Sequence, residues 1–179
     1  KNDLVCGGSM TDVKGDRGLR PSQQADPDLY LHAVEKKKDG IVVRGAKAHQ
    51  TGAVFSHELI VMPTVTMREE DKDYAVSFAT PSDAKGIIYI VGRQPNDTRK
   101  LEGSKIDVGN AEYSAAGHDP LVIFNNVFVP WERVLMCGEY DFTTMLVERF
   151  ASYHRQNYGG CKTGVGDVLI GAAATIAEY

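Results

Sequence analysis

The chain has 179 residues, 42% hydrophobic and 25% charged, which is an ordinary composition for a globular protein. Its 24 acidic and 20 basic residues give a net charge of −4, and the longest basic run is Lys36-Lys37-Lys38, so a nucleic-acid surface is not expected. No apolar run approaches the roughly 20 residues that span a bilayer, and no hydrophobic signal region follows Lys1. These features predict a cytoplasmic protein without a membrane partner.

The chain contains three cysteines, Cys6, Cys137 and Cys161. Their odd number and wide spacing argue against a disulfide framework and permit reduced thiols or metal ligation.

Residues 1–28 are rich in Gly, Asp, Ser and Pro, which predicts a loop-rich opening segment with short ordered stretches. Strand-like segments then recur with turn signals between them, at 29–35, 41–48, 58–62, 74–79, 87–91 and 121–129. This spacing predicts a mostly β fold, an antiparallel barrel or sandwich over residues 29–139.

After Pro130 the pattern changes to that of a helix. Asp141 is placed to cap a helix over residues 141–158, in which Met145, Leu146 and Phe150 recur at helical intervals. Gly159-Gly160 is expected to interrupt it, and residues 171–174 are expected to form a second helical segment. Residues 140–179 therefore read as the start of a C-terminal helical domain.

The densest group of reactive side chains lies at residues 153–162, where His154, Tyr158, Cys161 and Lys162 bring an imidazole, a phenol, a thiol and an amine together. On a straight helix His154 and Cys161 would be two turns, about 10.5 Å, apart. That separation is too long for a single metal ion unless the glycine pair bends the backbone, but a multi-iron cluster could use it. A surface histidine and a buried cysteine are the alternative reading of the same residues.

Two loops could bind a cofactor. Residues 10–17 combine a glycine-containing loop with Lys14 and Arg17, which suits a pyrophosphate or another anion, although a surface loop of mixed charge would look the same. Residues 48–52 follow a predicted strand and offer His49, Gln50 and Thr51 to the edge of a heteroaromatic ring, or serve as ordinary turn residues. The dinucleotide, nucleotide-phosphate and hydrolase motifs are absent.

Several motifs together carry a family resemblance. Met10-Thr11-Asp12-Val13-Lys14-Gly15-Asp16-Arg17, Asp26-Pro27-Asp28-Leu29-Tyr30 and Asp39-Gly40-Ile41-Val42-Val43-Arg44-Gly45-Ala46-Lys47 resemble the 4-hydroxyphenylacetate 3-hydroxylase family. His49-Gln50-Thr51-Gly52 and Tyr153-His154-Arg155-Gln156-Asn157-Tyr158-Gly159-Gly160-Cys161-Lys162 are similar to the branch of this family that dehydrates 4-hydroxybutyryl-CoA to crotonyl-CoA and isomerises vinylacetyl-CoA.

The resemblance implies the middle β-domain and first C-terminal helices of an acyl-CoA dehydrogenase-like subunit, which would lack a complete active site. The residues implied to contact FAD are Met10, Thr11, Lys14, Asp16, Arg17, His49, Gln50, Thr51 and Lys162. His154 and Cys161 match two of four ligands of a [4Fe–4S] cluster, and Cys6 and Cys137 are expected not to be ligands. The implied partners are an acyl-CoA substrate, the remaining N- and C-terminal helical regions of the subunit, and further subunits of a homotetramer.

In the radical dehydration that the resemblance implies, His154 would bind iron and also serve as a base, Tyr158 would exchange a proton near the substrate, and Lys162 would lie beside the flavin. Two other functions remain open. One is an FADH2-dependent aromatic-ring monooxygenase of the same family, and the other is a non-catalytic β-domain that only binds flavin.

Overall fold

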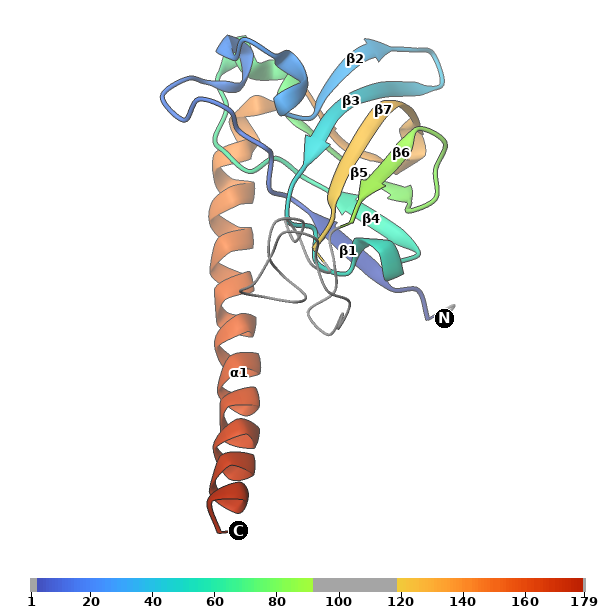
Figure 1. Cartoon of the computed structure of the whole chain (residues 1–179). Coiled ribbons are helices and arrows are strands. Elements are labelled where there is room, and N and C mark those ends of the chain that lie inside the picture. The colour runs from blue at the N-terminus through green and yellow to red at the C-terminus, as the bar shows by residue number, and fades with distance from the viewer. Residues whose placement is uncertain (1–2, 92–118, 179) are drawn as a thin grey trace, which may run out of the picture. The chain divides into compact units, whose positions relative to one another are not determined.

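The computed structural model describes residues 3–91 and 119–178, and the chain divides into two compact units, residues 1–143 and 144–179. The first unit is built from short strands and 3-10 turns, and the second is a helix (Figure 1). None of the helices in the described part of the chain combines the length and apolar character that a bilayer crossing requires.

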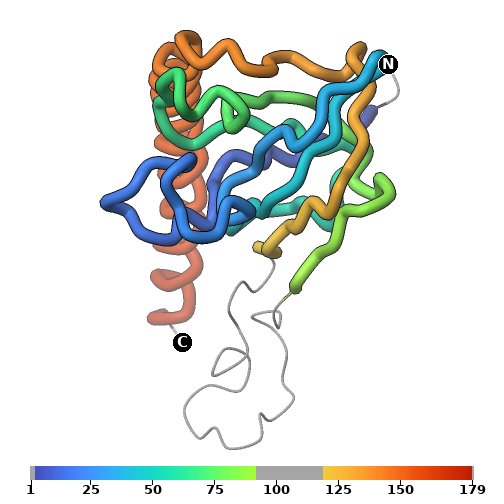
Figure 2. Tube along the Cα trace, turned by 90° about the horizontal axis from the view of Figure 1, so that it is seen from above, coloured from blue at the N-terminus to red at the C-terminus, as the bar shows by residue number. Residues whose placement is uncertain are grey.

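The described part of the first unit contains two four-stranded sheets. In one sheet, β1 (Cys6–Ser9) runs parallel to β4 (Glu58–Val61), and β5 (Val76–Pro81) and β8 (Val134–Cys137) continue it in antiparallel pairing. The other sheet is antiparallel throughout and has the order β2 (His32–Lys36), β3 (Gly40–Lys47), β7 (Leu121–Pro130) and β6 (Ile87–Ile90). Figure 2 shows β6, in green, alongside β7, in orange.

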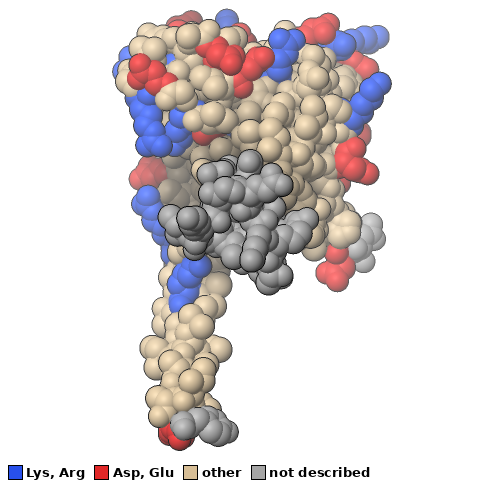
Figure 3. Space-filling model, in the orientation of Figure 1, with Lys and Arg blue, Asp and Glu red and all other residues tan. Residues whose placement is uncertain are grey.

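Short 3-10 turns connect these strands: η1 (Pro21–Gln23), η2 (Pro27–Leu29), η3 (Ala53–Phe55), η4 (Glu69–Tyr74), η5 (Trp131–Arg133) and η6 (Tyr140–Phe142). Acidic and basic side chains are interspersed on the face of this unit that Figure 3 shows. The Lys36-Lys37-Lys38 run is exposed at the end of β2 and in the turn that follows it, as its charge predicts.

The core of the first unit lies between the two sheets. Phe78 from β5 and Phe124 from β7 are fully buried, and their rings meet edge to face with centroids 6.0 Å apart. Around them pack alternate residues of strands from both sheets, including Ile41, Val43, Leu59, Val61, Val76, Val122, Val127 and Val129. Each fully buried aliphatic or aromatic side chain contributes about 1.5–3 kcal/mol. The predicted mostly β sandwich followed by a helical region is confirmed.

Two strands were not predicted from the sequence. Strand β1 contains Gly7 and Gly8, and glycine is normally depleted in strands. A Cβ at Gly7 would lie 3.0 Å from Ser56 Oγ and 3.2 Å from Leu59 Cδ2, so glycine allows the close parallel approach to β4. Strand β8 is only four residues long and is stabilised by its pairing with β5.

The second unit corrects the predicted break at Gly159-Gly160. Helix α1 runs without interruption from Thr143 to Ala177, a length of 35 residues that includes the predicted second segment at 171–174. A glycine lowers helix stability by about 1 kcal/mol but removes no backbone hydrogen bond, and Thr163 Oγ1 also donates to Gly159 O at 2.8 Å. Asp141 does not cap this helix and lies in the preceding turn η6.

Candidate functional site

The two loops singled out in the sequence meet at the end of β3. Thr11 O accepts hydrogen bonds from Ala48 N at 2.8 Å and from Gln50 Nε2 at 3.1 Å. Gln50 is buried, and its side chain also donates to Ala48 O. The loop at 10–17 and the loop at 48–52 are therefore hydrogen-bonded to each other in the first unit.

A buried ion pair fixes this junction. Lys47 and Asp12 are only 2% and 3% exposed, and Lys47 Nζ lies 2.7 Å from Asp12 Oδ1. The ammonium also donates to Met10 O and Met62 O, each at 2.9 Å, while Thr64 Oγ1 donates to Asp12 Oδ2 at 2.9 Å. Every proton of the ammonium thus has an acceptor, which a buried charge requires.

The electrostatics of the pair reflect its burial. Burial lowers the pKa of Lys47, Lys14 lowers it further, and Asp12 acts in the opposite direction. Burial also raises the pKa of Tyr30. The negative charge of Asp12 raises this pKa further, and the positive charge of Arg17 lowers it. Charges on both sides of the 10–17 loop therefore influence the same small region.

The loop turns sharply between Asp12 and Arg17. Lys14 and Gly15 both have left-handed backbones, with φ of 79° and 57°. A side chain at Gly15 would collide with Leu29 and Gln24, at 2.5 and 2.6 Å. Beyond the turn, Asp16 Oδ1 accepts from Gly18 N at 2.8 Å. Asp16 therefore stabilises the loop.

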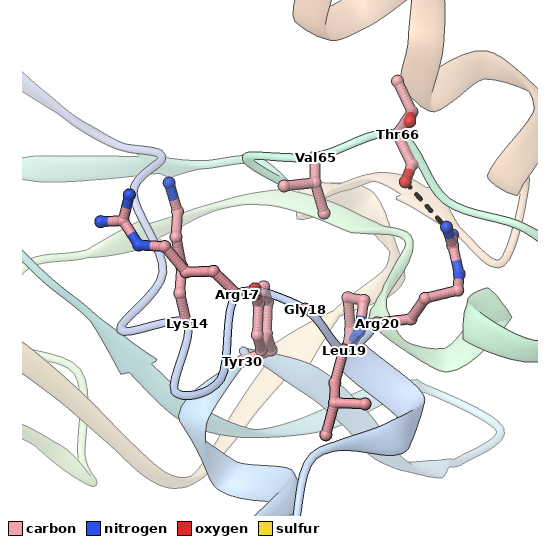
Figure 4. Close-up of a pocket in the computed structure, with 9 residues that line it drawn as sticks. Lys14, Arg17, Gly18, Leu19, Arg20, Tyr30, Val65 and Thr66 are labelled. Atoms are coloured by element: carbon pink, nitrogen blue, oxygen red, sulfur yellow. Dashed lines mark hydrogen bonds between the residues drawn. The ribbon is translucent and has the colours of Figure 1, made fainter.

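A pocket of about 440 Å³ opens beside this loop (Figure 4). Lys14 and Arg17 lie on one side of it and Arg20 and Thr66 on the other, with Tyr30 and Val65 facing each other between them. Within residues 3–91 and 119–178, neither Lys14 nor Arg17 forms an ion pair with an acidic side chain, so both cations are available to an anion. The pocket combines positive charge with aromatic and aliphatic walls.

Arg20, the third basic residue of the pocket, is already committed. Its guanidinium pairs with the fully buried Asp71. It also donates to Thr66 O, the contact that Figure 4 shows as a dashed line. Asp71 also accepts from Ser22 and from Arg68 N. Burial would raise the pKa of Asp71, but the hydrogen bonds from Ser22, Arg20 and Arg68 outweigh it and leave that pKa lowered. Arg20 and Asp71 therefore hold the wall of the pocket.

His49 and Thr51 flank the buried Gln50, and both side chains are exposed. His49 has a left-handed backbone, with φ of 56°, a conformation that is uncommon for residues other than glycine. Such conformations often occur at functional sites. The FAD contacts expected of Met10, Thr11, Lys14, Asp16, Arg17, His49, Gln50 and Thr51 stay a prediction.

The reactive residues of the second unit lie along one side of α1. The rings of Phe150 and His154 stack with centroids 5.4 Å apart and an interplanar angle of 10°. His154 is 5.8 Å from the Tyr158 ring, and Lys162 Nζ lies 4.8 Å from the centroid of the same ring. The four-residue spacing explains this row, because residues four apart are neighbours on a helix.

Cys161 lies seven residues after His154 and so falls near the same side of the helix. Because α1 is straight, the two residues are about 10.5 Å apart along the axis, and the predicted closure by a bend does not occur. Both side chains are exposed. Within the described residues, no group of three or more His, Cys, Asp or Glu side chains is placed to hold a metal ion. The described residues alone therefore do not support a mononuclear site.

The structural roles of Lys47, Asp12 and the Arg20–Asp71 pair were not predicted from the sequence. A signal for Lys47 was present, because it occupies the same inward register as Ile41 and Val43 in β3. A lysine at an inward strand position requires a buried acceptor. Asp71 lies in the acidic run Glu69-Glu70-Asp71 and carries no comparable signal.

The first unit is a β-sandwich in which two loops meet at the end of β3, and the helix that follows carries a row of reactive side chains. These features define the structural class of the chain, a β-domain followed by a helical region. Residues 1–136 match the family model for the 4-hydroxyphenylacetate 3-hydroxylase N terminal region, and residues 143–179 match the model for its C terminal region. The chain belongs to the 4-hydroxyphenylacetate 3-hydroxylase family, which confirms the resemblance seen in the sequence.

Within this family, the chain is most informatively compared with two 4-hydroxybutyryl-CoA dehydratases. Over its whole length the chain is 64% identical to the 4-hydroxybutyryl-CoA dehydratase/vinylacetyl-CoA-Δ-isomerase of Clostridium aminobutyricum, of which it covers 36%. It is also similar to an oxygen-tolerant archaeal 4-hydroxybutyryl-CoA dehydratase from N. maritimus, with a TM-score of 0.85, 56% identity, and coverage of 99% of this chain and 35% of that one.

A more distant solved structure is the oxygenase component of 4-hydroxyphenylacetate 3-monooxygenase complexed with FAD. Its TM-score is 0.59 at 25% identity, and the match covers 83% of this chain and 29% of that one. The chain spans about a third of the length of the relatives it matches.

Proposed function

We propose that this chain is the FAD-contacting region and first C-terminal helix of a radical dehydratase. The complete enzyme would convert 4-hydroxybutyryl-CoA to crotonyl-CoA and isomerise vinylacetyl-CoA, with FAD and a four-iron cluster as cofactors. The observation that carries the proposal is the row of His154, Tyr158 and Lys162, with Cys161 beside it, in a chain 64% identical to the clostridial dehydratase.

The residues around the 10–17 loop fit FAD. Its pyrophosphate is a dianion, and Lys14 and Arg17 offer two cations at the edge of a pocket whose other walls are Tyr30 and Val65. The buried pair of Asp12 and Lys47 holds the loop against the Gln50 segment, so donors and cations are arranged before a ligand arrives. The FAD complex of the distant oxygenase supports this assignment.

The residues on α1 fit part of a cluster site. His154 and Cys161 supply one imidazole and one thiolate, a donor set that iron–sulfur centres use. Two ligands cannot hold a cubane, so other regions of the subunit must supply the remainder. The exposed apolar residues Leu169, Ile170 and Ile176 of α1, which are 65%, 70% and 73% exposed, support coverage by further helices.

The four reactive residues of α1 have roles that fit their side-chain chemistry. His154 and Cys161 would bind iron, while Tyr158 would hold or release a proton at the phenol oxygen near the substrate. Lys162 would place a positive charge beside the flavin and stabilise its reduced form. FAD would supply one-electron chemistry, and iron would act as a Lewis acid toward the leaving hydroxyl.

The partners follow from the same assignment. They are an acyl-CoA substrate, the remaining N- and C-terminal helical regions of the subunit, and the other subunits of a homotetramer. Light scattering of the complete protein measures its assembly, and a monomeric mass would contradict the tetramer.

The test of the flavin assignment is FAD affinity. Replacing Lys14 and Arg17 together with Gln removes two charge-assisted contacts, each equivalent to about 1.5–3 kcal/mol, and should weaken FAD binding at least tenfold. The matched control replaces Lys37 and Lys38, which lie in the exposed β2–β3 turn, with Gln. Equal affinities for the two double variants would contradict the assignment.

A second function is favoured by the distant match to the FAD-bound oxygenase. An FADH2-dependent aromatic-ring monooxygenase would share the first unit but would not require His154 and Cys161 as metal ligands. Iron and flavin contents of the anaerobically purified complete protein separate the two, because the dehydratase needs about four irons per flavin and the monooxygenase needs none.

A further inference from the structure

We propose that Phe150 is a positioning residue that fixes the imidazole of His154 for metal binding. The inference rests on the proposed function, because it concerns the same site on α1. Neither the family similarity nor the sequence motif at 153–162 assigns a role to this phenylalanine. Its contact with His154 is the evidence.

The geometry of the contact is specific. The two rings are nearly parallel, at 10°, with centroids 5.4 Å apart, which corresponds to an offset stack. Phe150 precedes His154 by four residues, and a long helical side chain points back toward the preceding turn. The imidazole therefore lies over the Phe150 ring in one orientation.

His154 has few other constraints within the described residues. Its side chain is exposed, and its ring contacts in this part of the chain are with Phe150 and Tyr158. Metal-binding histidines are usually oriented by a hydrogen bond from the second ring nitrogen. Here ring stacking performs that orientation, and Phe150 is the closer and more parallel of the two rings.

The contact also links the whole row. Phe150 stacks on His154, which lies 5.8 Å from Tyr158, and Lys162 covers the Tyr158 ring at 4.8 Å. Loss of the phenyl ring would release the imidazole to other rotamers while Tyr158 and Lys162 keep their own contact. The expected defect is therefore specific to the ligand His154.

The experiment compares three variants of the complete, anaerobically reconstituted protein. Phe150→Leu keeps an apolar, helix-compatible residue but removes the ring, and Phe150→Tyr keeps the ring. Tyr153→Leu is the matched control, because it removes a 71% exposed aromatic residue from the same helix, and side chains of adjacent helical residues do not face each other. Thermal unfolding of the iron-free proteins verifies that all three remain folded.

The first readout is the rate at which a chelator removes iron. Loss of a residue that orients a ligand typically weakens metal binding 10–100-fold, so Phe150→Leu should release iron at least tenfold faster, while Phe150→Tyr and Tyr153→Leu should resemble the parent. The second readout is the ring-proton NMR shift of His154 in the iron-free 179-residue chain. It should move in Phe150→Leu and stay in Tyr153→Leu.

The outcomes separate this inference from the proposed function. Equal iron release and an unchanged His154 shift in Phe150→Leu would overturn the positioning role. Retention of all iron in His154→Ala would instead overturn the ligand assignment on which the proposed function depends.

Discussion

Replacement of Lys47 by Met should be among the most damaging single changes in the first unit. Methionine has a similar length and retains the apolar stem, but it removes the ammonium that Asp12, Met10 O and Met62 O surround at 2.7–2.9 Å. The variant leaves the carboxylate of Asp12 buried without its cation. Breaking a buried ion pair from one side costs about 3–5 kcal/mol.

That cost is large relative to the whole stability of a domain, which is about 5–15 kcal/mol. Because Thr11 and Gln50 are joined next to the ion pair, the same variant should also weaken FAD binding. The assay is urea unfolding of the chain, monitored by circular dichroism, with the midpoint and slope fitted together.

The matched control is Lys37→Met. Lys37 forms an ion pair with Glu35, and the two side chains are 43% and 59% exposed. An exposed pair contributes about 0–1 kcal/mol, so this variant should remain close to the parent. The double variant Asp12→Asn with Lys47→Met should recover part of the loss, because no unpaired charge remains. A loss in Lys47→Met no larger than that in Lys37→Met would refute the reasoning.

Three further predictions concern stability. The pKa of Asp71 is lowered from 3.8, so its carboxylate stabilises the fold above about pH 4, and this contribution is lost as pH falls through the lower folded-state pKa. The difference in unfolding free energy between the parent and Asp71→Asn should therefore shrink below pH 4. A difference that stays constant from pH 7 to pH 3 would contradict this. Gly45→Ala should lower the free energy of unfolding by at least about 1–3 kcal/mol, because φ is 132° and the new Cβ would lie 2.6 Å from Tyr30 O. Gly8→Ala is the control in the same denaturation series, because a Cβ there would meet nothing within 4 Å. Gly160→Ala should raise the helicity and thermal stability of α1 in the chain by up to about 1 kcal/mol, since no atom lies within 4 Å of the new methyl group; a decrease would indicate that the helix bends there.

Much of the fold could be predicted from the sequence. Alternating apolar residues and turn signals located β3, β4, β6 and β7 closely, because side chains on one face of each strand enter the core. Strands β1 and β8 could not be found in this way. Their residues are held by pairing with β4 and β5, which are distant in sequence.

The candidate site was predictable only in part. The loops at 10–17 and 48–52 were identified separately from residue types, but nothing local indicates that Thr11 O bonds to Gln50. Likewise, a glycine pair signals weak helix propensity, and the energetic cost at Gly159-Gly160 is small compared with that of breaking a long hydrogen-bonded helix. A local sequence pattern does not reveal contacts between distant segments or the cooperativity of helix formation.

The central claim is that His154 and Cys161 bind the same iron centre, and iron analysis of Cys161→Ala tests it most directly. The complete protein is reconstituted anaerobically and compared with Cys137→Ala, which removes a half-buried thiol outside the site. We expect Cys161→Ala to lose its cluster and its dehydratase activity and Cys137→Ala to keep both. Four irons and full activity in Cys161→Ala would contradict it.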